Sequence, residues 1–243
     1  MPLYNQNLYP VIIPSYEPDE RLITLLEDLK KNNLTKIIIV NDGSSSDYDS
    51  IFDRAEKEFG VILLKHPENQ GKGAALKTAF SYCLENIKDL KGCITADSDG
   101  QHTPASIINC IEALVNNPES LVMGVRDFTR PGIPKASLIG NVNTNKIIAK
   151  MYDKNLTDTQ TGLRGLPPFF MKECLLLKGN RFEYEMQMIR RALEKNIDFY
   201  EVPIDTVYDS EKNHATHFRP LIDTIKIYNS LGLFKSLKII LKK

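Results

Sequence analysis

The stretch Asp97-Ser98-Asp99-Gly100-Gln101 directly follows the apolar run Gly92-Cys93-Ile94-Thr95-Ala96, and these ten residues decide the fold class. A short apolar run after a helix-period segment predicts a buried strand of a parallel sheet. Both carboxylates would then emerge at the carboxyl end of that strand, where ligands bind in open α/β sheets. In extended chain, side chains two residues apart point to the same side, about 6 to 7 Å apart along the backbone. We therefore predict that one divalent cation, with positions free for phosphate oxygens, binds here.

A second acidic pair, Asp47-Tyr48-Asp49, has the same spacing but follows no predicted strand. Aspartate is favoured both in turns and at helix starts. We therefore predict a turn and a helix start at this pair, and no cation site.

The composition excludes several classes of protein. The 243 residues include 31 basic and 31 acidic side chains, so no net field attracts nucleic acid or an anionic membrane. The N-terminus has no targeting pattern, and no window reaches the roughly 20 apolar residues of a membrane-spanning helix. The four cysteines lack the spacing of a metal site and are expected to be buried reduced thiols of a cytoplasmic protein. They are Cys83, Cys93, Cys110 and Cys174.

Apolar runs alternate with helix-period segments through the first half, which is typical of βαβ units. The expected strands cover 11–13, 36–40, 61–64, 92–96 and 121–125, and the expected helices cover 22–29, 51–59, 73–86 and 104–115. In the second half we expect a loop over 128–135, helices over 139–151 and 184–193, and a polar segment over 157–165. Residues 197–207 read as an extended segment, which Pro203 restricts to a sheet edge. The pattern predicts one α/β domain whose second half completes the sheet of the first.

Two further strand ends are expected at the same sheet edge as Asp97. They carry Pro14-Ser15-Tyr16 and Asn41-Asp42-Gly43-Ser44. A glycine there permits a tight turn, and the Asp42 carboxylate can accept hydrogen bonds from a base or a ribose. Taken alone, the second motif is equally typical of an Asx turn. The convergence of three polar strand ends favours a ligand site.

The segment Asn69-Gln70-Gly71-Lys72-Gly73 lies where a third loop enters a helix. Glycines allow close backbone approach, a helix start offers free N–H groups, and Lys72 brings a positive charge for an anion. The spacing of a Walker A loop is missing. The alternative is a helix entry that needs glycine, with a solvated lysine.

These four motifs, together with the residues before and after them, resemble the family-2 glycosyltransferases, which have the GT-A fold. Within that family the chain is most similar to the polyprenyl-phosphate sugar synthases. The resemblance covers residues 9–220 and implies a GT-A, Rossmann-like, mostly parallel sheet flanked by helices. It divides a domain of residues 1–220 into a nucleotide-sugar-binding half (9–126) and an acceptor-side half (127–220). Residues 221–243 would form an amphipathic helical tail.

The resemblance also implies roles for single residues around the donor. Pro14, Tyr16 and Asp42 would line the base and ribose pocket. Relatives often carry a glutamate that grips the nucleotide after the first strand, and Glu17 lies one position before the place of that glutamate. Magnesium or manganese would be held by Asp97, Asp99 and Gln101. The donor diphosphate would meet Ser98, Lys72 and the arginine of Gly124-Val125-Arg126, whose planar fork of donors suits phosphate.

On the acceptor side, the resemblance covers the loop from Asp158 to Arg164, the segment Phe182-Glu183-Tyr184-Glu185 and the segment Thr216-His217-Phe218-Arg219-Pro220. It assigns Arg164, His217 and Arg219 to the acceptor or its phosphate. Asp158 is the candidate general base if the acceptor is a sugar hydroxyl. Its alternative role is structural, as a carboxylate that accepts backbone N–H groups of its own loop.

The resemblance implies an inverting, metal-dependent transfer of a hexose from a UDP- or GDP-linked donor to a polyprenyl or dolichyl phosphate. The alternatives are a saccharide acceptor in cell-surface polysaccharide synthesis, a sugar-1-phosphate nucleotidylyltransferase, and a non-catalytic nucleotide-sugar binding module. The tail at 221–243 could lie in a membrane interface, which would place the protein at the inner face of the membrane. It could equally pack on the core or form a homodimer contact.

Overall fold

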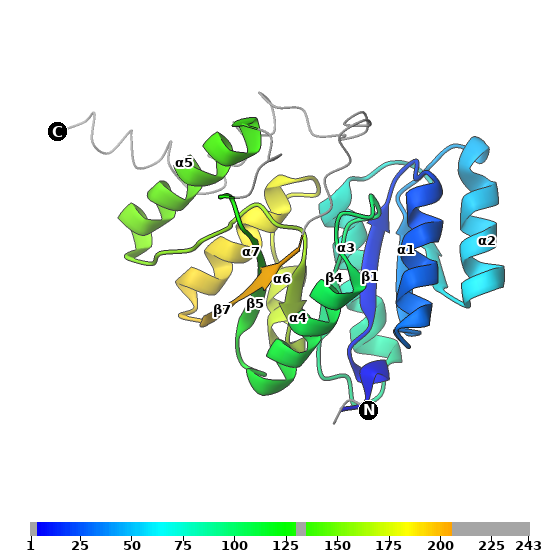
Figure 1. The fold of residues 1–243 in the computed structure, drawn as a ribbon, viewed down its shortest axis with the longest axis horizontal. Coiled ribbons are helices and arrows are strands. Elements are labelled where there is room, and N and C mark those ends of the chain that lie inside the picture. The colour runs from blue at the N-terminus through cyan, green and yellow to red at the C-terminus, as the bar shows by residue number, and fades with distance from the viewer. Residues whose placement is uncertain (1–3, 130–134, 206–243) are drawn as a thin grey trace.

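The computed structural model describes residues 4–129 and 135–205, which form a seven-stranded sheet with helices on both sides (Figure 1). The spatial order of the strands is β3-β2-β1-β4-β6-β5-β7. The strands are β1 (Val11–Ser15), β2 (Ile37–Asn41), β3 (Ile62–Lys65), β4 (Cys93–Thr95), β5 (Leu121–Arg126), β6 (Arg164–Leu166) and β7 (Phe199–Ile204). The α-helices are α1 (Glu20–Lys31), α2 (Asp49–Phe59), α3 (Lys72–Asn86), α4 (Pro104–Asn116), α5 (Lys135–Tyr152), α6 (Pro168–Leu175) and α7 (Glu183–Glu194). Short 3₁₀ helices cover Gln6–Leu8 and Ser46–Tyr48.

The sheet is buried on both faces because successive side chains of a strand point to opposite sides. In β1, Val11 and Ile13 face a core formed with α1, α2 and α4, whereas Ile12 faces a second core formed with α3, α6 and α7. Ile148 of α5 belongs to this second core. Strands with an apolar residue at nearly every position therefore serve two cores at once.

The predicted α/β architecture is confirmed, and the five strands expected in the first half are present within one or two residues of their expected bounds. Two elements of the second half were missed. The helix α6 lies in a stretch for which no element was predicted. The strand β6 has only three residues, and such a length shows no periodicity.

The strand β6 determines which loops share an edge of the sheet. It lies between β4 and β5 and runs antiparallel to both, with Arg164 opposite Thr95 on one side and Met123 on the other. The start of β6 therefore lies at the carboxyl end of its neighbours. As a result, the loop before Arg164 emerges beside the residues that follow β4 and β5. Within residues 4–129 and 135–205, the strand β7 pairs with β5 alone, which confirms the predicted edge position.

The remaining sequence expectations also have clear outcomes in the described ranges. The pair Asp47 and Asp49 lies in a 3₁₀ turn and at the start of α2, as predicted. All four cysteines are buried free thiols. Across residues 4–129 and 135–205, no helix has the length and hydropathy that a membrane crossing requires. His217, Arg219 and the tail at 221–243 lie outside the described residues.

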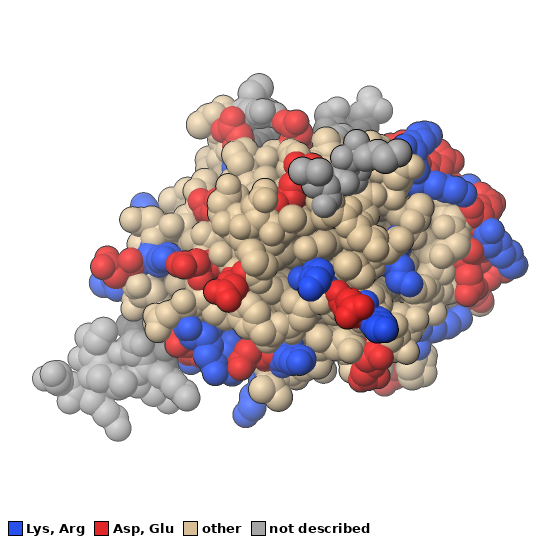
Figure 2. All heavy atoms as spheres, turned by 90° about the horizontal axis from the view of Figure 1, so that it is seen from below, with Lys and Arg blue, Asp and Glu red and all other residues tan. Residues whose placement is uncertain are grey.

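Acidic and basic side chains are mixed on the face that Figure 2 shows, which is seen from below Figure 1. No large area of that face carries one sign of charge. This mixture accompanies the equal totals of 31 basic and 31 acidic residues.

Candidate functional site

The carboxylates of Asp97 and Asp99 lie just beyond the end of β4, near the middle of the sheet. The expected extended geometry is wrong, because Ser98 and Asp99 form a turn that Gly100 continues at a φ of 73°. The Asp99 side chain accepts a hydrogen bond from the Gln101 backbone N–H at 3.0 Å. Asp and Gly favour such turns, and this preference overrides the strand geometry after Ala96.

The His102 side chain is hydrogen-bonded to the backbone at the start of this turn. Its Nδ1 accepts a hydrogen bond from the Asp97 backbone N–H at 3.1 Å, so the ring is neutral with its proton on Nε2. Burial lowers the pKa of His102, which opposes the effect of the two nearby aspartates. The sequence placed His102 in the motif but gave it no role. It is a residue that positions the backbone of Asp97.

Lys72, the first residue of α3, lies between two carboxylates. Its Nζ is 2.7 Å from Asp97 Oδ1 and 2.9 Å from Glu185 Oε2. Burial lowers the pKa of Lys72, but the two carboxylates outweigh this and raise it above the ordinary lysine value. Glu185 was missed as a site residue, although the sequence around it resembled a family segment. Only the packing of α7 against α3 identifies its partner.

The side chains after β4 fit a hard divalent cation. Carboxylate oxygens of Asp97 and Asp99 and the amide oxygen of Gln101 are the ligand types that magnesium and manganese prefer. Burial and the neighbouring Asp97 raise the pKa of Asp99, and a divalent cation would relieve this repulsion. Among the described residues, no group of three His, Cys, Asp or Glu side chains is arranged to hold a metal. Further ligands would therefore come from other oxygens, including those of a bound diphosphate.

Asp42, at the end of β2, joins this strand to the loop before α3. Its Oδ1 accepts hydrogen bonds from His66 Nδ1 at 2.7 Å and from the Gln70 N–H at 3.0 Å. Its Oδ2 accepts one from the Gly71 N–H at 2.7 Å. Asp42 is 3% exposed, and these three bonds leave one acceptor position on Oδ2.

The loops after β1 and β2 are held together at the same edge. The Glu17 N–H donates to Ser44 Oγ at 2.8 Å, and Glu17 has a φ of 50°. The Asn41 side chain accepts from the Ser44 N–H at 2.8 Å, three residues further on, so this side chain closes the loop after β2. Pro14 lies in β1 and Tyr16 follows it, so both belong to this edge.

Gly71 and Gly73, on either side of Lys72, leave room for the neighbouring residues Asn180 and Tyr184. A Cβ at Gly71 would clash with the backbone of Asn180, and a Cβ at Gly73 would clash with Tyr184. The Ala74 N–H, at the start of α3, donates to Asn180 O at 3.0 Å. The expected close approach of backbone is therefore an approach of α3 to the start of α7, which places Lys72 beside Glu185.

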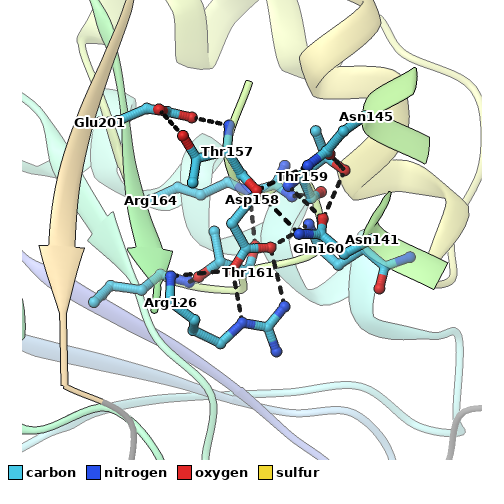
Figure 3. Close-up of polar contacts among 11 residues, drawn as sticks. Arg126, Asn141, Asn145, Thr157, Asp158, Thr159, Gln160, Thr161, Arg164 and Glu201 are labelled. Carbon is cyan, nitrogen blue, oxygen red and sulfur yellow. Dashed lines mark hydrogen bonds and ion pairs between the residues drawn. The ribbon is translucent and has the colours of Figure 1, made fainter. Parts of the chain in front are cut away.

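Arg126, the last residue of β5, forms a two-point ion pair with Asp158 (Figure 3). Arg126 Nε donates to Oδ2 at 2.6 Å and Nη2 donates to Oδ1 at 3.0 Å. Asp158 also accepts the Gln160 N–H at 3.0 Å, and its side chain has no exposed surface. The structural alternative stated for Asp158 matches this geometry, and its catalytic role stays a prediction.

The loop of residues 157–163, which carries Asp158 and precedes β6, is called the β6 loop. Side chains from two other elements hold it (Figure 3). On α5, Asn141 and Asn145 donate to Thr157 O at 3.0 and 2.8 Å. On β7, Glu201 accepts from the Thr157 N–H at 2.5 Å and from its hydroxyl at 2.6 Å. The loop is thus fixed on both sides.

Arg164 occupies the centre of the structure at 1% exposure. Its guanidinium donates to the carbonyl oxygens of Thr161 at 3.1 Å, Glu185 at 2.6 Å and Thr159 at 3.4 Å. These bonds and its burial tie the guanidinium to the surrounding backbone. The acceptor role of Arg164 stays a prediction.

A hollow of about 490 Å³ lies at the opposite edge of the sheet, where β2 and β3 begin. Its lining includes Ile37 and Ile62 but no residue predicted to carry chemistry. Because parallel strands present their ligand sites at the carboxyl ends, the chemistry belongs to the edge with Asp97.

Comparisons with known proteins identify the family of this chain. The sequence pattern described as glycosyl transferase family 2 matches residues 11–174. An uncharacterized protein of Methanocaldococcus jannaschii is 31% identical over 202 residues, which cover 82% of this chain and 81% of the relative. The UDP-N-acetylglucosamine–dolichyl-phosphate N-acetylglucosaminyltransferase of Methanococcus voltae is 28% identical, over 95% of this chain and 97% of that protein.

Among solved structures, the glucosyl-3-phosphoglycerate synthase of Mycobacterium tuberculosis, in complex with Mn²⁺, UDP and glucosyl-3-phosphoglycerate, superimposes with a TM-score of 0.65. The superposition covers 96% of this chain and 86% of the synthase at 13% identity, so it bears on the fold alone. The predicted GT-A architecture is confirmed. The pattern match over two thirds of the chain, the near-complete coverage of a glycosyltransferase relative and the acidic turn at the sheet edge together place this chain in glycosyl transferase family 2.

Proposed function

We propose that this glycosyltransferase moves a hexose from a UDP-linked donor, with inversion and with a divalent cation, to a polyprenyl or dolichyl phosphate. The single observation that carries the proposal is the acidic turn at Asp97 and Asp99, with Lys72 on one side and Arg126 beyond the β6 loop. It brings hard oxygen ligands and two cationic side chains to one edge of the sheet. UDP is preferred to GDP because the M. voltae relative, similar over 97% of its length, is named for a UDP-linked donor.

Each residue has a task at the donor. Asp97, Asp99 and Gln101 would hold magnesium or manganese, which supplies positive charge to stabilise the departing diphosphate. Lys72 and Arg126 would add fixed positive charge where negative charge develops. Pro14, Tyr16, Glu17 and Asp42 would line the base and ribose, and Ser98 would lie beside the diphosphate.

The chemistry of the acceptor follows from the state of Asp158. A sugar hydroxyl must lose its proton during transfer, and Asp158 is the base that the sequence offers. Its carboxylate is buried, and both oxygens accept from Arg126. A phosphate acceptor is already anionic near neutral pH and needs no base, so the geometry supports a lipid-linked phosphate over a saccharide.

The test is transfer by the full chain from UDP-N-acetylglucosamine, UDP-glucose or GDP-mannose to polyprenyl phosphate in detergent, with Mn²⁺ or Mg²⁺. We expect a lipid-linked sugar and free UDP from at least one of the two UDP-linked donors. Asp97→Ala and Asp99→Ala should remove the product. The matched control is Asp47→Ala, which alters the exposed acidic pair and should leave activity intact.

Three results would count against the proposal. Transfer to saccharide acceptors alone would establish the other acceptor class. Formation of a nucleoside triphosphate from pyrophosphate and the sugar nucleotide would indicate nucleotidyl transfer. Full activity with a chelator present, or with Asp99→Ala, would exclude the cation site.

A further inference from the structure

The ion cluster of Lys72, Asp97 and Glu185 joins three distant parts of the chain. Lys72 begins α3, Asp97 follows β4, and Glu185 lies in the first turn of α7. The side chains of Lys72 and Glu185 are 16% and 13% exposed, whereas that of Asp97 is 31% exposed. The ammonium is therefore screened from water, and Asp97 is its more accessible partner.

The position of Lys72 is set by backbone packing. Gly73 lies directly against Tyr184, and the Ala74 N–H donates to Asn180 O at 3.0 Å. At the start of α7, the Glu183 side chain accepts the N–H groups of Asn180 and Arg181 at 3.2 and 3.3 Å. Because both helix starts are held together, Lys72 stays beside Glu185 whether or not Asp97 is its second partner.

Lys72 and a divalent cation would compete for the same carboxylate. The Lys72 ammonium lies 2.7 Å from Asp97 Oδ1, so it already offsets much of the charge of this carboxylate. A cation that binds Asp97 would also lie a few ångströms from the ammonium and be repelled by it. A diphosphate brings negative charge that offsets this repulsion.

We infer that Lys72 is a built-in counter-cation that occupies Asp97 until metal and nucleotide arrive together, and that Glu185 is the positioning residue that keeps Lys72 paired when Asp97 takes the metal. This inference rests on the proposed cation site. It makes metal binding dependent on the donor, because metal alone must displace the ammonium without the help of phosphate charge. Glu185 removes the cost of leaving a buried ammonium unpaired after the exchange.

The test measures Mn²⁺ binding to the full chain by electron paramagnetic resonance, first without nucleotide and then with UDP. Lys72→Met should bind Mn²⁺ alone about tenfold more tightly or better, because the competing charge is gone. Lys72→Arg keeps the charge and should bind like the unaltered protein. Glu185→Gln leaves Asp97 as the sole carboxylate partner of Lys72 and should bind Mn²⁺ alone more weakly.

Two matched controls separate the exchange from a general change in charge. Lys77→Met removes a lysine further along α3, whose Nζ donates to Gly179 O at 2.8 Å, and should leave the affinity unchanged. Glu183→Gln removes a carboxylate from the same turn as Glu185 but keeps an amide oxygen that accepts the N–H groups of Asn180 and Arg181, so it should also leave the affinity unchanged. UDP should increase Mn²⁺ affinity strongly in the unaltered protein and much less in Lys72→Met.

The possible outcomes distinguish a failure of this inference from a failure of the proposed cation site. If Lys72→Met binds Mn²⁺ alone no more tightly than Lys77→Met, or if Glu185→Gln matches Glu183→Gln, the inference is wrong although the cation site stands. If the unaltered protein fails to bind Mn²⁺ even with saturating UDP, the proposed cation site itself is wrong. Because Lys72→Met and Glu185→Gln are expected to shift the affinity in opposite directions, a general loss of structure cannot imitate the result.

Discussion

The Asp158→Ala substitution gives the sharpest test of how the β6 loop is held. It removes two hydrogen bonds of the Arg126 guanidinium, at 2.6 and 3.0 Å, and the acceptor of the Gln160 N–H. Removing one partner of a buried ion pair costs about 3–5 kcal/mol. Arg126 is 15% exposed and recovers some hydration, so the lower end, about 3 kcal/mol, is expected.

For a chain of this length, that loss lowers the midpoint of thermal unfolding by roughly 6–12 °C. Thermal and urea unfolding of the full chain measure it directly. The control is Asp198→Ala, whose carboxylate is 82% exposed and should leave the midpoint unchanged. The double change of Asp158→Leu with Arg126→Met should recover part of the lost stability, because both charges of the ion pair are then replaced by apolar side chains.

The reasoning is refuted if Asp158→Ala keeps the stability of the unaltered protein while the turnover rate falls about 10²–10⁴-fold. That combination would assign Asp158 to proton transfer. Activity is therefore measured well below the unfolding midpoint of each variant.

Three further outcomes follow from other contacts. In Gly162→Ala, the new methyl group would overlap the Asp97 carboxylate and displace this ligand, so Mn²⁺-dependent UDP binding should fall about tenfold or more. The control Gly140→Ala meets the flexible Gln160 side chain and should retain binding. Equal binding by the two variants would contradict the contact between Gly162 and Asp97. Glu201→Ala removes both hydrogen bonds to Thr157 and should cost about 1–2 kcal/mol in urea unfolding, with Glu201→Gln keeping part of it; no change would mean that β7 does not hold the loop. His66→Ala should lower the free energy of unfolding by about 1–3 kcal/mol, because Asp42 loses the hydrogen bond of 2.7 Å from His66. The same change should weaken UDP binding in calorimetry. A UDP affinity equal to that of the unaltered protein would mean that Asp42 does not belong to the nucleotide pocket.

Most strands and helices of the first half could be predicted because each is indicated by a short run of neighbouring residues. Runs such as Ile37 to Val40 are short, β-branched and apolar at every position, which is typical of a strand covered on both faces. The helix of residues 20–31 begins at a capping Asp19 and repeats leucine at helical spacing. Polar residues directly after three such strands could then be placed at one edge from the rule for parallel sheets.

The sequence alone also separated the acidic pair of the site from the pair at Asp47. Both have the same spacing, but only Asp97 follows an apolar strand. What the sequence misjudged was the local path, because the preference of Asp and Gly for a turn acts within four residues and ends the strand at Thr95.

Only the tertiary structure decided the partners of the charged side chains. The amino-acid sequence determined most of the strands and helices and the edge at which polar residues gather, since each depends on the order of neighbouring residues. It did not indicate that three residues starting at Arg164 form a strand between β4 and β5, nor that Asp158 pairs with Arg126, 32 positions away. Those contacts, like that of Lys72 with Glu185, depend on which elements pack together, and packing is decided by the summed burial of whole faces.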